Sequence, residues 1–156
     1  FIKNIIVRHF FLCSKDSEKI KQRDNMEHQI QVRVRYSETD QMGVVYHGSY
    51  IPFFERGRVE GLRAKGVSYK SLEESGIGLP IVSMTLNYKK PARYDDLLTI
   101  KTIFKKHSSV KIEFDCEIWS EQNELLTTAY FILVFVDMKT GRPMVPPDYL
   151  KAVMNL

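Results

Sequence analysis

Asp40 and His47 are the residues of this 156-residue chain whose types and positions are best suited to catalysis. They lie in a glycine-containing segment between an expected strand and an expected helix. A carboxylate that is ionised at neutral pH can attack a carbonyl group or take a proton from water. The unpaired amides at a helix N-terminus carry about half a positive charge and can polarise a carbonyl oxygen. This combination suits acyl hydrolysis, particularly of thioesters, because a thiolate leaves without strong protonation.

The sequence lacks the signatures of several other enzyme classes. It has no nucleophile elbow, no glycine-rich dinucleotide or phosphate loop, and no zinc-protease motif. Its four histidines, at positions 9, 28, 47 and 107, are too scattered to predict a metal site. The two cysteines, Cys13 and Cys116, form neither a C-x-x-C motif nor a disulfide framework. We therefore expect no metal and no separate cofactor.

The net charge of +4 is concentrated at the beginning of the chain. Of the 23 basic and 19 acidic side chains, residues 1–25 hold six and three, so the remaining residues are almost neutral and do not predict nucleic-acid binding. Arg8 and His9 interrupt the apolar stretch of residues 1–25, which therefore predicts no signal peptide and no membrane insertion. We expect a cytoplasmic protein, with residues 1–25 a leader from translated upstream or cloning sequence and residues 26–156 a single domain.

Two periodicities predict the first elements of this domain. Apolar residues alternate with polar ones over residues 30–36, which is typical of a strand with one buried face. Over residues 49–65 apolar residues recur at every third or fourth position, which predicts an amphipathic helix with Ser49 as its N-cap. Gly57 and Gly61 each cost this helix about 1 kcal/mol relative to alanine. We expect them to permit close approach of the helix backbone to a sheet or to another chain.

The second half of the domain is expected to be mostly strands. A short helix is expected over residues 69–75. Period-two alternation then predicts strands at residues 82–88, 98–104, 110–118 and 125–136. Their short connections predict antiparallel pairing, and hence an α+β domain whose one long helix covers a curved sheet. Because residues 129–136 have no polar face, we expect the helix to cover one side of this strand and a second subunit to cover the other.

One segment resembles a known family. Residues 36–58, YSETDQMGVVYHGSYIPFFERGR, are similar to the signature of hotdog-fold acyl-CoA thioesterases of the 4-hydroxybenzoyl-CoA thioesterase family, particularly the bacterial branch associated with the Tol-Pal system. The run NYKKPARYDD at residues 87–96 extends the resemblance, which covers about residues 28–150. It implies a hotdog fold, in which a five-stranded antiparallel sheet wraps around one long central helix. It also implies a homodimer or homotetramer with the coenzyme A (CoA) site at a subunit interface.

The resemblance also implies roles for individual residues. The family's catalytic aspartate matches Asp40, and the active-site histidine of one branch matches His47, near which a helix-start amide binds the thioester oxygen. We expect the substrate site to include further residues, namely Tyr46, Gly48, Glu55, Lys89, Lys90 and Arg93. The three basic residues suit the phosphates of CoA, although a charged strand end also discourages aggregation. Glu55 is either a second pocket carboxylate, as in another thioesterase branch, or the ion-pair partner of Arg58.

The sequence leaves three functions open. The first is hydrolysis of a short-chain or aromatic acyl-CoA, with Asp40 as nucleophile or general base. The second is a non-catalytic acyl-CoA-binding or protein-interaction module of the same fold. The third is hydration of an enoyl thioester, as in the hotdog hydratases. Their usual motif separates aspartate and histidine by five positions, whereas Asp40 and His47 are seven apart, which disfavours this third function.

Overall fold

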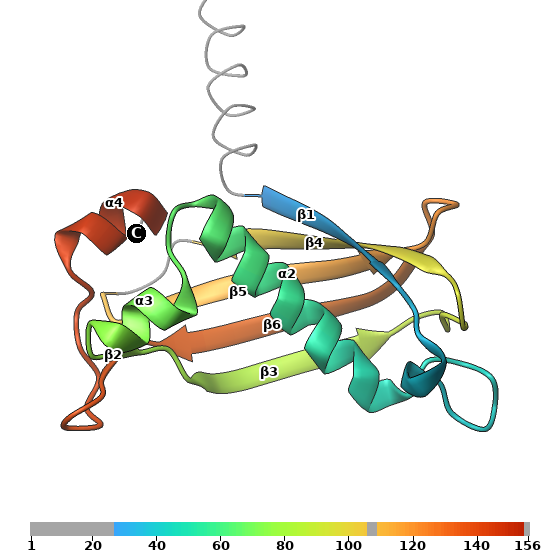
Figure 1. Ribbon diagram of the computed structural model, residues 1–156, viewed down its shortest axis with the longest axis horizontal. Helices are drawn as coiled ribbons and strands as arrows, with labels where there is room; N and C mark the ends of the chain where they lie inside the picture. The colour runs from blue at the N-terminus through green and yellow to red at the C-terminus, as the bar shows by residue number, and fades with distance from the viewer. Residues whose placement is uncertain (1–26, 106–108, 155–156) are drawn as a thin grey trace, which may run out of the picture.

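The computed structural model describes residues 27–105 and 109–154, and its main feature is a five-stranded antiparallel sheet with one long helix lying across it (Figure 1). The strands lie in the order β1-β4-β5-β6-β3. Their bounds are β1 Glu27–Arg33, β3 Ile81–Tyr88, β4 Leu97–Lys105, β5 Lys111–Trp119 and β6 Leu125–Val134. The predicted α+β class is confirmed. The expectation for residues 1–25 concerns a segment outside the described residues.

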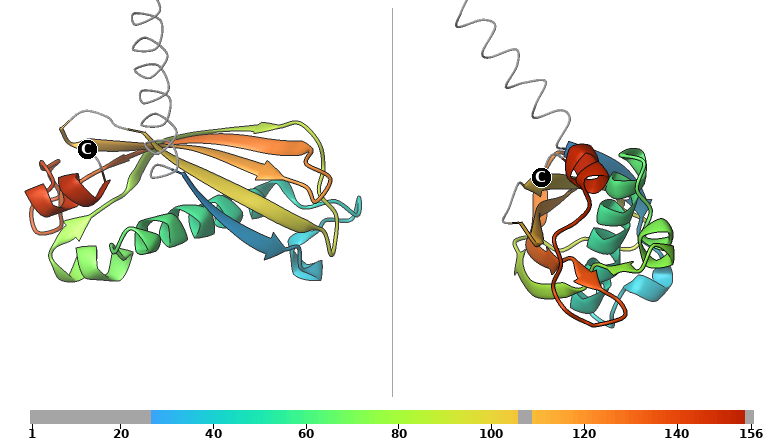
Figure 2. Two further views of the ribbon diagram at one scale, coloured as in Figure 1. Left: turned by 90° about the horizontal axis from the view of Figure 1, so that it is seen from above. Right: turned by 90° about the vertical axis from the view of Figure 1, so that its left-hand side faces the viewer.

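The long helix α2, Tyr50–Ala64, packs against the inner side of the curved sheet (Figure 2). Two glycines allow this close approach. A Cβ atom on Gly57 would lie 2.8 Å from Cγ2 of Ile100, and one on Gly61 would lie 3.0 Å from Cζ of Phe104. The expected reason for glycine at these helix positions, close packing against a sheet, is confirmed.

The hydrophobic core lies between α2 and the sheet. Phe54 of α2 packs edge-on against Phe131 of β6, with ring centroids 5.8 Å apart. Phe104 and Phe114 of the neighbouring strands β4 and β5 pack in the same way at 5.1 Å. Alternate residues of the three middle strands are buried on this side, as the period of two requires. This aromatic layer fixes the position of α2 over the sheet.

Several short elements complete the domain. They are α3 Tyr69–Glu74, β2 Ile77–Gly78, β7 Val136–Asp137 and α4 Asp148–Met154. The helix α3 confirms the short helix expected over residues 69–75. The strands β2 and β7 pair as a separate two-stranded sheet. The helix α4 was not expected from the sequence pattern. In the part of the chain that the structure describes, no helix is both long and apolar enough to span a membrane.

The first and the last of the predicted strands differ from the structure by more than one residue. The first strand ends at Arg33, because Tyr36–Glu38 form a 3₁₀ turn in which Tyr36 is 80% exposed. The last long strand, β6, ends at Val134, and the chain continues into β7 in the other sheet. One face of β6 is buried against the core, whereas residues of its other face, such as Tyr130 and Ile132, are partly exposed in this single chain.

The strand β3 is an edge strand with little cover. It pairs with β6 on one side, and its other side has no strand partner among the residues described. Three of its apolar residues, Ile81, Val82 and Met84, are 41%, 57% and 47% exposed. A long apolar strand with an unpaired edge is prone to pair with a further strand.

Candidate active site

A tight loop presents Asp40 in front of the long helix. The amide of Asp40 donates a hydrogen bond to the carbonyl oxygen of Val44 at 2.9 Å. Gly43 lies at φ 74°, a left-handed conformation that glycine adopts without strain. The Oδ1 atom of Asp40 accepts a hydrogen bond from the amide of Met42 at 2.8 Å. The loop thus orients the carboxylate with one bond and leaves further lone pairs for a ligand, because a carboxylate has about four acceptor sites.

The first helical turn begins at His47, ahead of α2. His47–Ser49 form a 3₁₀ turn that continues directly into α2, and the carbonyl oxygen of Tyr46 accepts the amide of Ser49 at 2.8 Å. Ser49 occupies the N-cap position of α2, as predicted, but it has a helical conformation and its side chain makes no capping bond. The amides of His47 and Gly48 open this turn and have no acceptor within the described ranges.

Two tyrosines tie the helix start to the segment after β3. The hydroxyl group of Tyr88 donates a hydrogen bond to the carbonyl oxygen of His47 at 3.1 Å. The hydroxyl oxygen of Tyr50 accepts one from the amide of Ala92 at 3.2 Å, and the two tyrosine rings meet edge-on at 5.4 Å. Burial raises the pKa of Tyr50, so this phenol is neutral at physiological pH. These contacts position the helix start relative to the end of the sheet.

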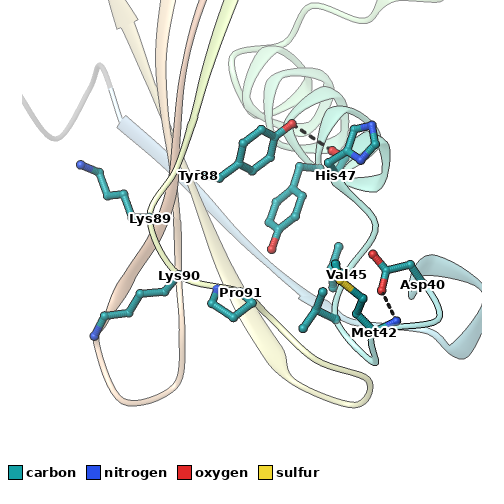
Figure 3. A pocket seen from close by; sticks show the side chains of 10 residues that line it. Asp40, Met42, Val45, His47, Tyr88, Lys89, Lys90 and Pro91 are labelled. Atoms are coloured by element: carbon teal, nitrogen blue, oxygen red, sulfur yellow. Dashed lines mark hydrogen bonds between the residues drawn. The ribbon is translucent and has the colours of Figure 1, made fainter.

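Asp40 and His47 line one cavity of about 320 Å³, between the loop, the helix start and the end of β3 (Figure 3). We call it the Asp40 cavity. Its other lining residues are Met42, Val44, Val45, Tyr50, Tyr88, Lys89, Lys90 and Pro91. Most of these walls are apolar or aromatic, with a few polar groups, which is typical of small-molecule sites. The arrangement joins a carboxylate to a helix start in a mainly apolar space, which is what acyl hydrolysis requires.

Four of the eight predicted site residues meet at this cavity, namely Asp40, His47, Lys89 and Lys90. Figure 3 shows the side chains of Lys89 and Lys90 directed away from Asp40, toward the outside of the cavity. Lys90 also forms an ion pair with Glu124. The two lysines therefore contribute positive charge at the outer side of the site.

Three other predicted residues lie close by but do not line the Asp40 cavity. Tyr46 is 47% exposed, and its ring packs against the imidazole of His47 with centroids 4.1 Å apart. Gly48 lies under the same ring, because a Cβ atom there would come within 2.7 Å of Cε1 of Tyr46. Arg93 is exposed beyond the cavity.

Glu55 lies in a second cavity, of about 410 Å³, which we call the Arg58 cavity. The alternative expectation for Glu55, an ion pair with Arg58, is wrong. Arg58 is only 3% exposed and its guanidinium lies over the ring of Phe131 of the sheet at 4.6 Å, whereas Glu55 is exposed. The spacing argument holds elsewhere on the same helix, where Glu60 pairs with Arg63.

The sequence reasoning missed Tyr88 and Tyr50 as site residues. Period-two alternation assigns Tyr88 to the apolar face of its strand and does not show that its hydroxyl group reaches His47. Its position directly before two lysines in the NYKKPARYDD run is the one signal that could have identified it. Within residues 27–105 and 109–154, no group of three or more His, Cys, Asp or Glu side chains could hold a metal ion.

The fold and the site together define a protein of the hotdog thioesterase class. The family model described as the thioesterase-like superfamily matches residues 34–154. The chain belongs to this family, as the resemblance in the sequence predicted.

Individual relatives agree with this assignment. The chain is 37% identical over 121 residues to the acyl-CoA thioester hydrolase YbgC of Escherichia coli O6:H1, covering 78% of this chain and 90% of the relative. It is 32% identical over 125 residues to the acyl-CoA thioesterase YbgC of Haemophilus influenzae, covering 80% and 91%. Among solved structures, the DHNA-CoA thioesterase from Staphylococcus aureus is similar with a TM-score of 0.77 and 33% identity, covering 83% of this chain and 89% of that one. The hotdog fold is thereby confirmed.

Proposed function

We propose that the protein hydrolyses the thioester bond of a short-chain or aromatic acyl-CoA at the Asp40 cavity. The observation that carries the proposal is that the Asp40 carboxylate and the helix start at His47 line the same cavity. Membership of the thioesterase-like superfamily and the names of its relatives support thioester hydrolysis as the reaction. The assignment of roles to Asp40 and His47, and of the substrate class, rests on the geometry described above.

In the proposed reaction, the carbonyl oxygen of the thioester accepts hydrogen bonds from the amides of His47 and Gly48. Asp40 either attacks the carbonyl carbon to form a mixed anhydride, which water then hydrolyses, or takes a proton from a water molecule that attacks directly. In both routes the carbon–sulfur bond breaks and CoA leaves as a thiolate that is then protonated. The products are a carboxylic acid and free CoA. One oxyanion donor of this kind is worth about 10² to 10³ in rate.

His47 is assigned a supporting role. Its imidazole lies at the cavity and packs against the ring of Tyr46, whose position Gly48 permits. From this place its protonated imidazole can donate a proton to the departing thiolate, and the proton that the attacking water releases restores it. Its backbone contributes separately, because the amide of the same residue opens the helical turn.

The basic residues beyond the cavity suit the CoA part of the substrate. Lys89 and Lys90 follow the last residue of β3, and Arg93 is exposed a few residues further along. Because Lys90 already forms an ion pair with Glu124, Lys89 is expected to contribute more to phosphate binding. When the CoA part of the substrate lies outside the Asp40 cavity, the acyl group enters the cavity between Met42, Val44 and Pro91. The cavity volume of about 320 Å³ suits a short or aromatic acyl group.

A homodimer formed along β3 fits this site. The edge of β3 is unpaired in the described chain and carries exposed apolar side chains, which favours pairing with an antiparallel second copy. Tyr88, the last residue of β3, and Lys89, which follows it, line the Asp40 cavity. A second copy at this edge would therefore border the active site.

The decisive experiment measures thiol release from a panel of CoA thioesters, for example butanoyl-CoA, benzoyl-CoA and palmitoyl-CoA. We expect hydrolysis of the first two and a fall in kcat/KM of at least about 10²-fold for Asp40→Asn. The matched control is Asp95→Asn, which changes an exposed aspartate in a loop beside Arg33. Equal thiol release by wild type and Asp40→Asn would refute the mechanism.

The same panel, extended with crotonyl-CoA, separates the alternative functions. Acyl-CoA binding by calorimetry without thiol release would indicate a non-catalytic module. Loss of the double bond of crotonyl-CoA without thiol release would indicate a hydratase. Either result in the wild-type protein would replace the proposed hydrolysis.

A further inference from the structure

Met42 is the most exposed methionine of the described residues, and it lies at the wall of the Asp40 cavity. The residue is 78% exposed, whereas Met138 and Met84 are 54% and 47% exposed and Met154 is fully buried. A small oxidant reaches an exposed thioether more readily than a buried one. Met42 therefore combines access for oxidants with a place in the proposed active site.

The backbone of Met42 is part of the turn that holds Asp40. Its amide donates the 2.8 Å hydrogen bond to Oδ1 of Asp40, and the amide of Gly43 donates one to the carbonyl oxygen of Asp40 at 3.0 Å. Figure 3 shows Met42 and Asp40 on this one loop, where both line the cavity. A chemical change at the sulfur atom of Met42 therefore takes place at the wall that also carries the proposed catalytic carboxylate.

Oxidation changes the character of this wall. The thioether of Met42 contributes an apolar surface together with Val44, Val45 and Pro91. A sulfoxide is polar and larger by one oxygen atom, and placing a polar group without a hydrogen-bond donor against an apolar acyl group is unfavourable. The sulfoxide oxygen is also a hydrogen-bond acceptor that draws water into the space that the acyl group needs. We therefore expect oxidation of Met42 to weaken binding of the acyl group.

The buried cysteine is a poor competitor for oxidants. Cys116 is only 1% exposed, and burial raises the pKa of its thiol to about 12. The reactive thiolate is therefore almost absent at neutral pH. Among the residues that the structure describes, Met42 is the sulfur-containing residue that lines the Asp40 cavity.

We propose that Met42 is an oxidation site through which peroxides weaken acyl-group binding in the Asp40 cavity. The sulfur atom attacks one oxygen of hydrogen peroxide, the O–O bond breaks, a sulfur–oxygen bond forms, and the second oxygen leaves as water. Sulfur loses two electrons, which the peroxide gains. A methionine sulfoxide reductase reverses the change, because two thiols supply two electrons, form a disulfide and release the oxygen as water. The inference rests on the proposed function in that the acyl group binds in this cavity, and it does not require that hydrolysis follows.

The test treats the full chain with hydrogen peroxide, removes the excess with catalase and locates the added oxygen by peptide mass spectrometry. We expect Met42 to be oxidised at a lower peroxide concentration than the less exposed Met138 and Met84. The affinity for S-butyl-CoA, a thioether analogue that cannot be hydrolysed, should then fall by at least about five-fold in calorimetry. The value of kcat/KM for butanoyl-CoA should fall by a similar factor, mainly through KM. Methionine sulfoxide reductases with dithiothreitol should restore both quantities.

Variants assign the effect to one sulfur atom. Met42→Leu keeps an apolar side chain of similar size but has no sulfur to oxidise. Its own untreated affinity for S-butyl-CoA is the reference, and peroxide should leave that affinity unchanged. Met138→Leu is the matched control, because Met138 is an exposed methionine after β7 that does not line the cavity, and it should lose affinity as wild type does. Met42→Gln places a polar side chain of similar length there and should weaken binding without peroxide.

Several results would overturn the inference. They are oxidation of Met138 and Met84 ahead of Met42, equal loss of affinity in wild type and Met42→Leu, or unchanged affinity in wild type whose Met42 is fully oxidised. Absence of S-butyl-CoA binding to untreated wild type would do the same. Binding of S-butyl-CoA without hydrolysis of butanoyl-CoA would refute the proposed function alone, and a loss of affinity on oxidation of Met42 would still support the inference.

Discussion

The hydroxyl group of Tyr88 donates a hydrogen bond to the carbonyl oxygen of His47 over 3.1 Å, although the two residues are 41 positions apart. That carbonyl group and the amide of Gly48 belong to one planar peptide unit. The bond therefore fixes the direction of the Gly48 N–H group, which is one of the two proposed oxyanion donors. A residue at the end of the edge strand thus orients the helix start.

Tyr88→Phe tests this relationship. Removing the hydroxyl group frees the peptide between His47 and Gly48 to rotate. We therefore expect kcat to fall by about 5- to 30-fold with a smaller change in KM, because the lost bond is worth about 1 to 2 kcal/mol. Steady-state thiol release measures both constants. Tyr94→Phe is the control, since Tyr94 is an exposed tyrosine that packs against Tyr36. An unchanged kcat in Tyr88→Phe would show that the bond does not position a catalytic group.

Lys89→Ala tests the CoA phosphate contact. We expect KM for an acyl-CoA to rise by about three- to ten-fold, since an exposed charge pair with phosphate is worth about 1 kcal/mol. KM for the same acyl group on pantetheine, which lacks the nucleotide phosphates, should not change. Lys70→Ala on α3 serves as the control because Lys70 is an exposed lysine paired with Glu74. Equal effects on both substrates would place the role of Lys89 elsewhere.

Val82→Lys tests assembly along β3. Val82 is exposed on the unpaired edge strand, and a lysine there is a common device against edge pairing. We expect wild type to sediment as a dimer or tetramer and Val82→Lys to shift toward the monomer in analytical ultracentrifugation. Val145→Lys, which adds the same charge at an exposed valine before α4, should leave the wild-type distribution unchanged. A dimer that persists in Val82→Lys would exclude this edge as the interface.

Cys116 makes stability fall at alkaline pH. Burial, its largest influence, raises the pKa of this thiol from about 9 in the unfolded chain to about 12 in the folded protein. The folded state therefore holds a proton that the unfolded state loses, so its contribution to stability is complete below about pH 9 and decreases as pH rises toward 12. We expect this group to lower the free energy of unfolding by up to about 1.4 kcal/mol per pH unit in that range.

Urea unfolding of wild type and Cys116→Ala at a series of alkaline pH values measures this effect. Other groups that titrate in the same range are present in both proteins, so only the difference between the two curves reports on Cys116. The advantage of wild type over Cys116→Ala should shrink as pH rises. A difference that is constant across this range would contradict the raised pKa.

Residue types and their periodicity predict most of the backbone of this protein. The alternation in residues 98–104 and 110–118 recurs in β4 and β5, because a strand with one buried face must place apolar side chains at every second position. The three-to-four spacing over residues 49–65 recurs in α2, and Gly57 marks where the helix touches the sheet. The motif around Asp40 identifies the family as well. These features depend on neighbours within a few positions along the chain, so the sequence itself contains them.

Other features depend on which segments meet in space. The three-residue spacing on the helix predicts an ion pair between Glu55 and Arg58. In the structure, however, the Arg58 side chain is buried against the ring of Phe131 in the sheet, and Glu55 is exposed. Ser49 is the N-cap of α2 as predicted, but its side chain makes no capping bond, and the 3₁₀ turn before it is positioned by Tyr88, at the end of β3, which donates a hydrogen bond to the carbonyl group of His47.

The Asp40 cavity and the Arg58 cavity also combine features that the local sequence predicts with features that only the packed chain determines. Residue types show which side chains can bind or react, whereas strand order and helix packing decide which of them face a common space. Asp40 and His47 were foreseeable because one short loop carries both. Tyr88 and the buried Arg58 were not, because burial and contact across the sheet are properties of the packed chain and have no local signal in the sequence.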